Sequence, residues 1–203
     1  MRALERVLER ARGPVAALAR LAALAGGLVL VALVGLICLS VLTRALGTLG
    51  NAHATETALP ALAAWMAATF GPVPGDFELV EAGIAFAIFA FLPLCQLHGG
   101  HATVDLFTDR LPGRGSAWLV AFWEIALALA LVLIAVQLGE GLRGKWRTGE
   151  TTFLLQFPVW WAYAASLAAA TVAALVGLYC ALARVAEAAT GASLLPREVE
   201  GDR

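Results

Sequence analysis

The sequence predicts an all-α integral membrane protein with four transmembrane helices and short interfacial helices. Apolar residues make up 61% of the 203-residue chain and charged residues 14%, whereas an ordinary globular domain has about 45–50% and about 25%. The apolar runs are long, continuous and rich in alanine and leucine, which favours helices over a membrane barrel. This composition excludes a disordered chain and a soluble enzyme, and the net charge of −1 gives no indication of a nucleic-acid partner.

Gaps between charged residues locate the spans, because a bilayer core needs roughly 20 consecutive apolar residues in helical form. Arg20 and Arg44, for example, bracket 23 uncharged residues. The sequence predicts a membrane domain over residues 21–185, between a basic N-terminal segment, 1–20, and a C-terminal tail, 186–203. Its four expected spans are about 21–43, 78–97, 116–138 and 158–183.

A fifth apolar stretch, residues 57–70, is too short to cross a bilayer comfortably. It contains Trp65 and Phe70 and ends at a Gly-Pro pair. The stretch predicts a short helix that lies at the membrane interface or packs on the mouth of the bundle.

The basic residues predict the orientation of the chain. Ten of them fall in the N-terminal segment, the loop 98–115 and the residues after 183, and four fall on the other side. Cytoplasmic segments carry the excess of Lys and Arg, so both termini are expected in the cytoplasm, as an even number of spans requires. The first span is expected to be a retained anchor, because its apolar run is longer than that of a typical signal peptide.

Small residues mark candidate helix–helix contacts, since helices in lipid associate by close packing. In the fourth span they recur every four residues on one face, and the first span has Ala23, Gly27 and Gly35 on a similar face. An alanine-rich helix can also produce such rows by chance. The fourth-span residues are Ala165, Ala169, Ala173 and Gly177.

Two clusters mark the ends of spans. Pro158 stands at the start of the fourth span, where proline is tolerated, and Trp160 and Trp161 follow it as expected for an aromatic belt at headgroup depth. The second span starts with three acids, which complement a helix dipole or dock a periplasmic partner. These acids are Asp76, Glu78 and Glu81.

Glu124 is the one carboxylate deep inside a predicted span, roughly two turns in from Ser116. A charge at such a depth costs about 2.5–3.5 kcal/mol on insertion scales, so the side chain is expected to face protein or water or to be protonated. A neutral interhelical hydrogen bond and a contact with a partner subunit are both open interpretations, with a slight preference for the partner.

We expect no cofactor, no metal site and no catalytic site. A membrane redox protein that binds haem or quinone is the alternative, but it would need paired histidines or cysteines across the spans. His98 and His101 lie three residues apart at one helix end, and His53 is expected on the other side. A membrane enzyme would need polar groups that converge at one depth, and the spans offer few.

Three stretches resemble a known family. The first is the acidic start of the second span, residues 75–81. The second is a glycine–histidine hinge in residues 94–112. The third is a proline–tryptophan start of the last span, residues 151–163. The residues that carry these motifs are Asp76, Glu78, Glu81, Gly100, His101, Asp105, Leu111, Pro112, Pro158, Trp160 and Trp161. In this order, on four spans, they resemble the small permease subunit of tripartite ATP-independent periplasmic (TRAP) transporters over about residues 21–185.

The resemblance implies a non-catalytic role in the bacterial inner membrane. In such systems a large multi-span permease carries the substrate and sodium sites, and a soluble periplasmic protein captures the solute and delivers it. Organic acids are the common solutes, and uptake is coupled to sodium. The small subunit is expected to widen the scaffold of the large one, so the implied partners are that permease, the solute-binding protein and membrane lipid.

Overall fold

The computed structural model describes residues 2–51, 57, 59–71, 73–99 and 113–191 of the chain. These residues form helices and contain no strand beyond one isolated bridge between Thr151 and Pro158. The predicted all-α class is therefore confirmed. The helices are α1 (Arg2–Gly50), α3 (Pro60–Thr69), α4 (Asp76–Leu97), α5 (Gly113–Thr148) and α6 (Trp160–Thr190).

Four of these helices, α1, α4, α5 and α6, are long and apolar enough to cross a membrane. They contain the four predicted spans, apart from the two residues before Trp160, but two of them are far longer than predicted. At a rise of about 1.5 Å per residue, the 49 residues of α1 extend about 73 Å and the 36 of α5 about 54 Å. A bilayer core is only about 30 Å thick. Charged residues therefore marked the expected edge of the bilayer and not the end of the helix.

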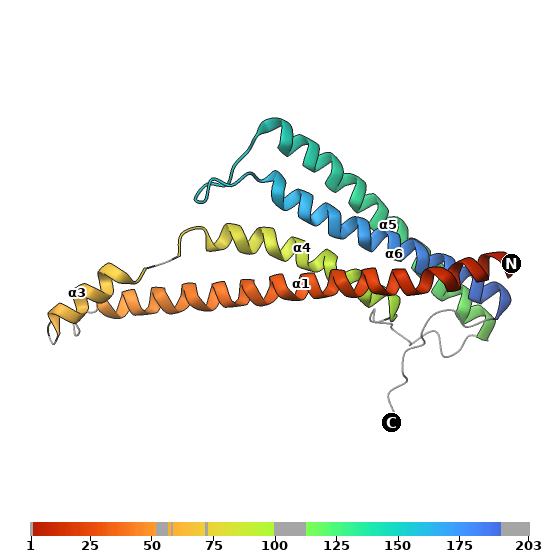
Figure 1. Ribbon diagram of the computed structural model, residues 1–203, viewed down its shortest axis with the longest axis horizontal. Helices are drawn as coiled ribbons and strands as arrows, with labels where there is room; N and C mark the ends of the chain where they lie inside the picture. The colour runs from red at the N-terminus through yellow and green to blue at the C-terminus, as the bar shows by residue number, and fades with distance from the viewer. Residues whose placement is uncertain (1, 52–56, 58, 72, 100–112, 192–203) are drawn as a thin grey trace, which may run out of the picture.

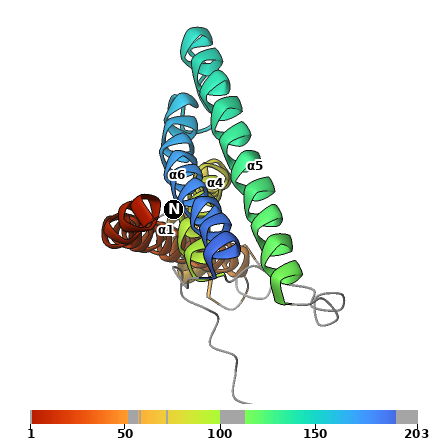
Figure 2. The same cartoon turned by 90° about the vertical axis from the view of Figure 1, so that its right-hand side faces the viewer.

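The four long helices form a row and not a closed bundle. α1 packs on α4, α4 packs on α6, and α6 packs on α5. Figures 1 and 2 show α1 and α5 on opposite flanks, with α4 and α6 between them. α5 and α6 diverge from α1 and α4 toward the loop that joins them, residues 149–159.

α6 is the centre of the row. Both apolar core clusters include its residues, and the first half of α1 reaches it as well. There the Tyr179 hydroxyl donates a hydrogen bond of 3.1 Å to the buried Leu8 carbonyl. The N-terminal end of α1 and the C-terminal end of α6 therefore lie together, at what we call the terminal end of the fold.

One stripe of α1 faces α6, α4 and, at Gly47, the residues that follow α3, and its buried positions recur every seven residues. Such a seven-residue repeat keeps one face of a helix against its neighbours. Gly26 allows the closest approach, because a Cβ there would lie 2.9 Å from the Cβ of Ala90 on α4. Gly27 and Gly35, suggested by the sequence, lie beside this stripe. The buried positions are Ala19, Gly26, Leu33, Ser40 and Gly47.

The short helix α3 folds back on the last turns of α1. Proline occupies its first turn and Trp65 stacks edge-on against Phe70 at 5.5 Å. The helix lies within the stretch 57–70 that the sequence indicated, and its position relative to the membrane stays a prediction.

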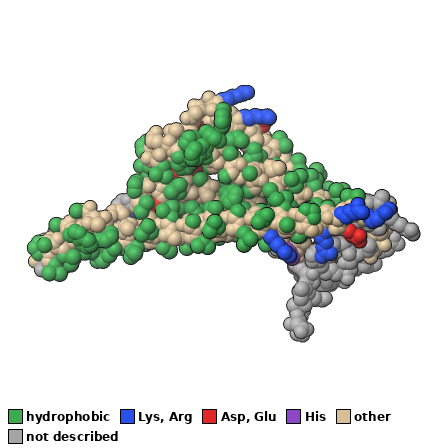
Figure 3. All heavy atoms as spheres, in the orientation of Figure 1, with side chains coloured by type: hydrophobic (Ala, Val, Ile, Leu, Met, Phe, Trp, Pro, Cys, Tyr) green, Lys and Arg blue, Asp and Glu red, His purple; other side chains and the backbone are tan. Residues whose placement is uncertain are grey.

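The outer faces of α1 and α5 are apolar and exposed. Figure 3 shows hydrophobic side chains along the length of α1, with Lys and Arg gathered near the N-terminus and at the tip of α5. The exposed residues of α1 include Leu21, Leu24, Leu28, Val31 and Val34, and those of α5 include Phe122, Trp123, Leu129 and Leu133.

We predict that Gly26→Leu destabilises the fold and that Gly35→Leu does not. A side chain at Gly26 meets Ala90, whereas a Cβ at Gly35 meets no atom within 4 Å. Overpacking of a tight contact costs typically about 1–3 kcal/mol. Thermal unfolding of the two variants in detergent measures the difference, and equal melting temperatures would contradict the α1–α4 contact.

Candidate functional site

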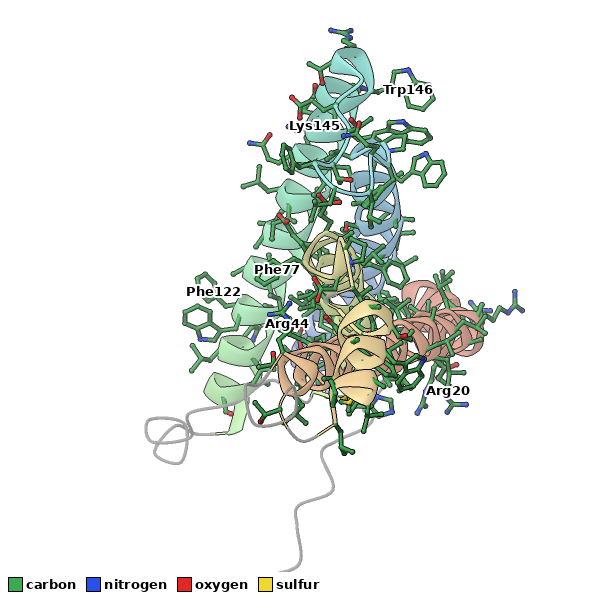
Figure 4. All side chains as sticks on the ribbon, turned by 90° about the vertical axis from the view of Figure 1, so that its left-hand side faces the viewer. Arg20, Arg44, Phe77, Phe122, Lys145 and Trp146 are labelled. Carbon is green, nitrogen blue, oxygen red and sulfur yellow. The ribbon has the colours of Figure 1, made fainter. Side chains whose placement is uncertain are left out.

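The acidic start of α4 connects three parts of the molecule. Its first acid, Asp76, accepts the Ser40 hydroxyl of α1 and, at 2.8 Å, the backbone N–H of Phe77. The Arg44 guanidinium of α1 lies 4.0 Å from the same carboxylate. Figure 4 shows Arg44 and Phe77 where α1 and α4 adjoin. Asp76 therefore connects the start of α4 to a buried serine of α1.

Glu78 fastens the 149–159 loop to α4. Its two carboxylate oxygens accept the backbone N–H groups of Leu154 at 2.7 Å and Leu155 at 3.0 Å. Hydrogen bonds to an ionised acceptor are stronger than neutral ones. Gly75 has a positive φ of 78°, and a Cβ there would overlap the side chain of Leu155. The loop therefore lies directly over the first turn of α4.

The loop has its own internal bonds. The Thr152 N–H donates to the Phe157 carbonyl at 2.9 Å, and the Val159 N–H donates to the Glu150 carbonyl at 3.0 Å. Gln156 turns the chain with a φ of 56°. These bonds hold the loop in a tight hairpin. Glu78 therefore binds a segment that its own hydrogen bonds already order.

Glu81, the third acid, has a different environment. It is exposed, and its carboxylate makes no hydrogen bond or ion pair within the described part of the chain. It lines a cavity of about 360 Å³ between α4, α6 and the loop. Two of the three predicted acids thus act inside the fold, and the third is open to a ligand. Docking of a periplasmic partner on them stays a prediction.

The small-residue face of α6 lies mostly between helices. Ala173 is buried beside Leu131 of α5, and Gly177 packs on Gln96 of α4. Ala169 is also buried, whereas Ala165 is exposed. The structure therefore buries three of the four residues and places Ala173 and Gly177 against neighbouring helices.

Gln96 is a buried polar residue that no motif in the sequence marked. The residue is 1% exposed, and neither amide atom has a hydrogen-bond partner among the residues that the structure describes. An unpaired buried amide is costly. Its signal in the sequence was an amide at the end of an otherwise apolar span.

Glu124 lies inside the fold and is 8% exposed. This burial turns the carboxyl toward protein and not toward lipid. Arg184 forms an ion pair of 3.0 Å with Glu187. The chain therefore shields the Glu124 side chain from lipid, and its contact with a partner subunit stays a prediction.

The aromatic residues at the start of α6 form a cluster with the end of α5. The rings of Trp146 and Trp160 lie 4.4 Å apart, and those of Trp160 and Trp161 lie 6.0 Å apart. Pro158 precedes the helix and its carbonyl accepts the Trp161 N–H at 3.1 Å. Lys145, which pairs with Glu150, and Trp146 stand near the tip of α5 in Figure 4. Anchoring at headgroup depth stays the prediction for these residues.

The predicted hinge falls outside the described residues, and nothing is assigned to it from the structure. It comprises Gly100, His101, Asp105, Leu111 and Pro112. In the described part of the chain, no three His, Cys, Asp or Glu side chains gather as a metal site would require.

Four apolar helices that cross a membrane, with polar bonds concentrated at the helix ends, define a multi-pass membrane protein. The chain belongs to the family of tripartite ATP-independent periplasmic transporters, DctQ component, whose model matches residues 65–188. The match extends from α3 nearly to the end of α6 and confirms the resemblance found in the sequence. The protein is thus the small component of a TRAP transporter, a family of transporter components and not of enzymes. No curated protein and no solved structure matches the chain.

We predict that Glu78→Ala releases the 149–159 loop from α4. The backbone N–H groups of Leu154 and Leu155 lose their acceptors, so their hydrogen exchange becomes faster. Glu81→Ala is the matched control, one turn further along the same helix, and leaves this exchange unchanged. Unchanged exchange in Glu78→Ala would refute the contact.

We predict that Glu124→Gln is well tolerated and that Glu124→Leu is not. Gln can still hydrogen-bond as a protonated acid does, and interhelical hydrogen bonds in membranes are worth about 0.6 kcal/mol on average. Leu has no polar group, so the group that interacts with Glu124 loses its partner. Melting temperature and co-purification with the large subunit measure the effect. If Glu124→Gln lowers the melting temperature or co-purification, the negative charge itself is needed. A cation on the partner subunit would explain such a need.

Proposed function

We propose that this small TRAP component is a non-catalytic scaffold for a large permease subunit in an ion-gradient-driven uptake system. Family membership carries the proposal. The row of helices supports it, because α1 and α5 leave apolar faces exposed along their lengths. Few polar side chains line the described spans, which argues against a solute pathway through this chain alone.

The proposed partners follow from the tripartite composition of the family. A large multi-span permease holds the solute and sodium sites, and a periplasmic solute-binding protein delivers the solute. Organic acids are the proposed solute class, and sodium is the proposed coupling ion. Lipid surrounds the remaining apolar surface.

The proposed location is the bacterial inner membrane with both termini in the cytoplasm. The excess of basic residues at the terminal end supports this orientation. The segments 1–20 and 186–203 then lie on the cytoplasmic side of the membrane domain 21–185. α3 and the 149–159 loop face the periplasm, and the aromatic cluster of α5 and α6 lies at the outer headgroups.

We predict that liposomes with this protein alone take up no organic acid. Uptake requires the large permease, the binding protein and an inward sodium gradient together with this chain. Radiolabelled solute uptake measures each combination, with a collapsed sodium gradient as the control. Uptake by this chain alone, or full uptake without it, would contradict the scaffold role.

A further inference from the structure

The cavity beside Glu81 has the shape and chemistry of a site for an amphiphile. Its walls are one face of α4 and one face of α6, its back is Leu138 of α5, and its roof is the 149–159 loop. The volume of about 360 Å³ lies within the range of ligand sites, roughly 300–1,000 Å³. Alanines on both walls, Ala82, Ala85 and Ala162, make the space.

The cavity extends over about half the bilayer. On α4 it extends from Glu78 to Phe89, which is about 16 Å at 1.5 Å per residue. One leaflet of the hydrocarbon core is about 15 Å deep. The charged end lies at the first turn of α4 and the apolar end lies toward the middle of the helix. This gradient matches a lipid with its headgroup at the mouth and one acyl chain inside.

The charges at the mouth select the headgroup. Among the described residues, the lining contains two carboxylates, Glu78 and Glu81, and no Lys or Arg. Glu78 is occupied by the loop N–H groups, whereas Glu81 is unpartnered within the described part of the chain. The aromatic rings of Phe157 and Tyr163 also line the site, and aromatic faces attract ammonium groups. Anionic headgroups would be repelled.

A hydroxyl in the wall adds a hydrogen-bonding group to the site. Ser166 lines the cavity, and the residue is 3% exposed. No hydrogen bond of its hydroxyl is found among the residues that the structure describes, and the hydroxyl opens on the cavity and is not sealed in the core. It can therefore donate to a glycerol or ester oxygen of a bound lipid.

We propose that this cavity binds one phospholipid with an ammonium headgroup, the ammonium at Glu81 and an acyl chain between α4 and α6. The site goes beyond the scaffold role and does not depend on it. A bound lipid fills the wedge where α4 and α6 diverge. The site favours phosphatidylethanolamine or phosphatidylcholine over phosphatidylglycerol.

Native mass spectrometry of the purified full chain tests the proposal, with phosphatidylethanolamine and phosphatidylglycerol as probes. We expect one retained phosphatidylethanolamine and little phosphatidylglycerol. Ala85→Phe and Ala162→Phe fill the cavity and abolish retention, whereas Ile84→Phe, on the exposed face of α4, retains the lipid. Equal retention of the two lipids, or retention by both filled variants, would overturn the proposal.

A variant that removes only a charge tests the proposal even if a variant with a filled cavity fails to fold. Glu81→Gln weakens phosphatidylethanolamine binding about two- to fivefold, the range of a partly exposed ion pair, and raises the relative retention of phosphatidylglycerol. Glu140→Gln, a carboxyl outside the cavity, leaves both unchanged. An unchanged lipid preference in Glu81→Gln would refute the role of the carboxylate. Transport assays are not needed, so failure of the scaffold role and failure of the lipid site are distinguishable.

Discussion

The arrangement of the chain depends on how closely its other helices can approach α6. Lipid gives helices no hydrophobic reason to associate, so close packing of small residues must hold them together. α6 meets this need on three sides, with Gly177 under Gln96 of α4, Ala173 beside Leu131 of α5, and Tyr179 bonded to Leu8 of α1. Larger side chains at Gly177 and Ala173 would separate α4 and α5 from α6. The alanine content of α6 is therefore what makes it the centre of a row.

Hydrogen bonds at the start of α4 add to the contacts that the small residues make. There Asp76 bonds to Ser40 of α1 and Glu78 bonds to the loop before α6. A hydrogen bond specifies direction and register more strictly than an apolar contact does. The same acids complement the dipole of α4. One short segment thus fixes α1, α4 and the α5–α6 loop relative to one another.

The number of membrane spans followed from the sequence. Charged side chains are too costly to leave in lipid, so long gaps between charged residues reveal the spans. The lengths did not follow, since a helix such as α1 continues to Gly50 after its apolar run ends. The repeat of small residues every four positions correctly indicated Ala169, Ala173 and Gly177 as buried positions of α6. The same repeat did not single out Gly26 on α1, because the sequence does not show which of several neighbouring small residues faces another helix. The partners of Glu78 are backbone groups, which no sequence pattern marks.

The crossing geometry explains why the loop must be fastened where it is. α4 and α6 approach most closely near the terminal end, where Gln96 packs on Gly177, and they diverge toward the start of α4 (Figure 1). Divergence opens the cavity lined by Ala82, Ala85 and Ala162. The loop lies above this gap, where Thr152, Phe157 and Val159 line the cavity, and it has a directed attachment to α4. Glu78 supplies that attachment with two bonds from one carboxylate, while Glu81, one turn below, stays available at the mouth.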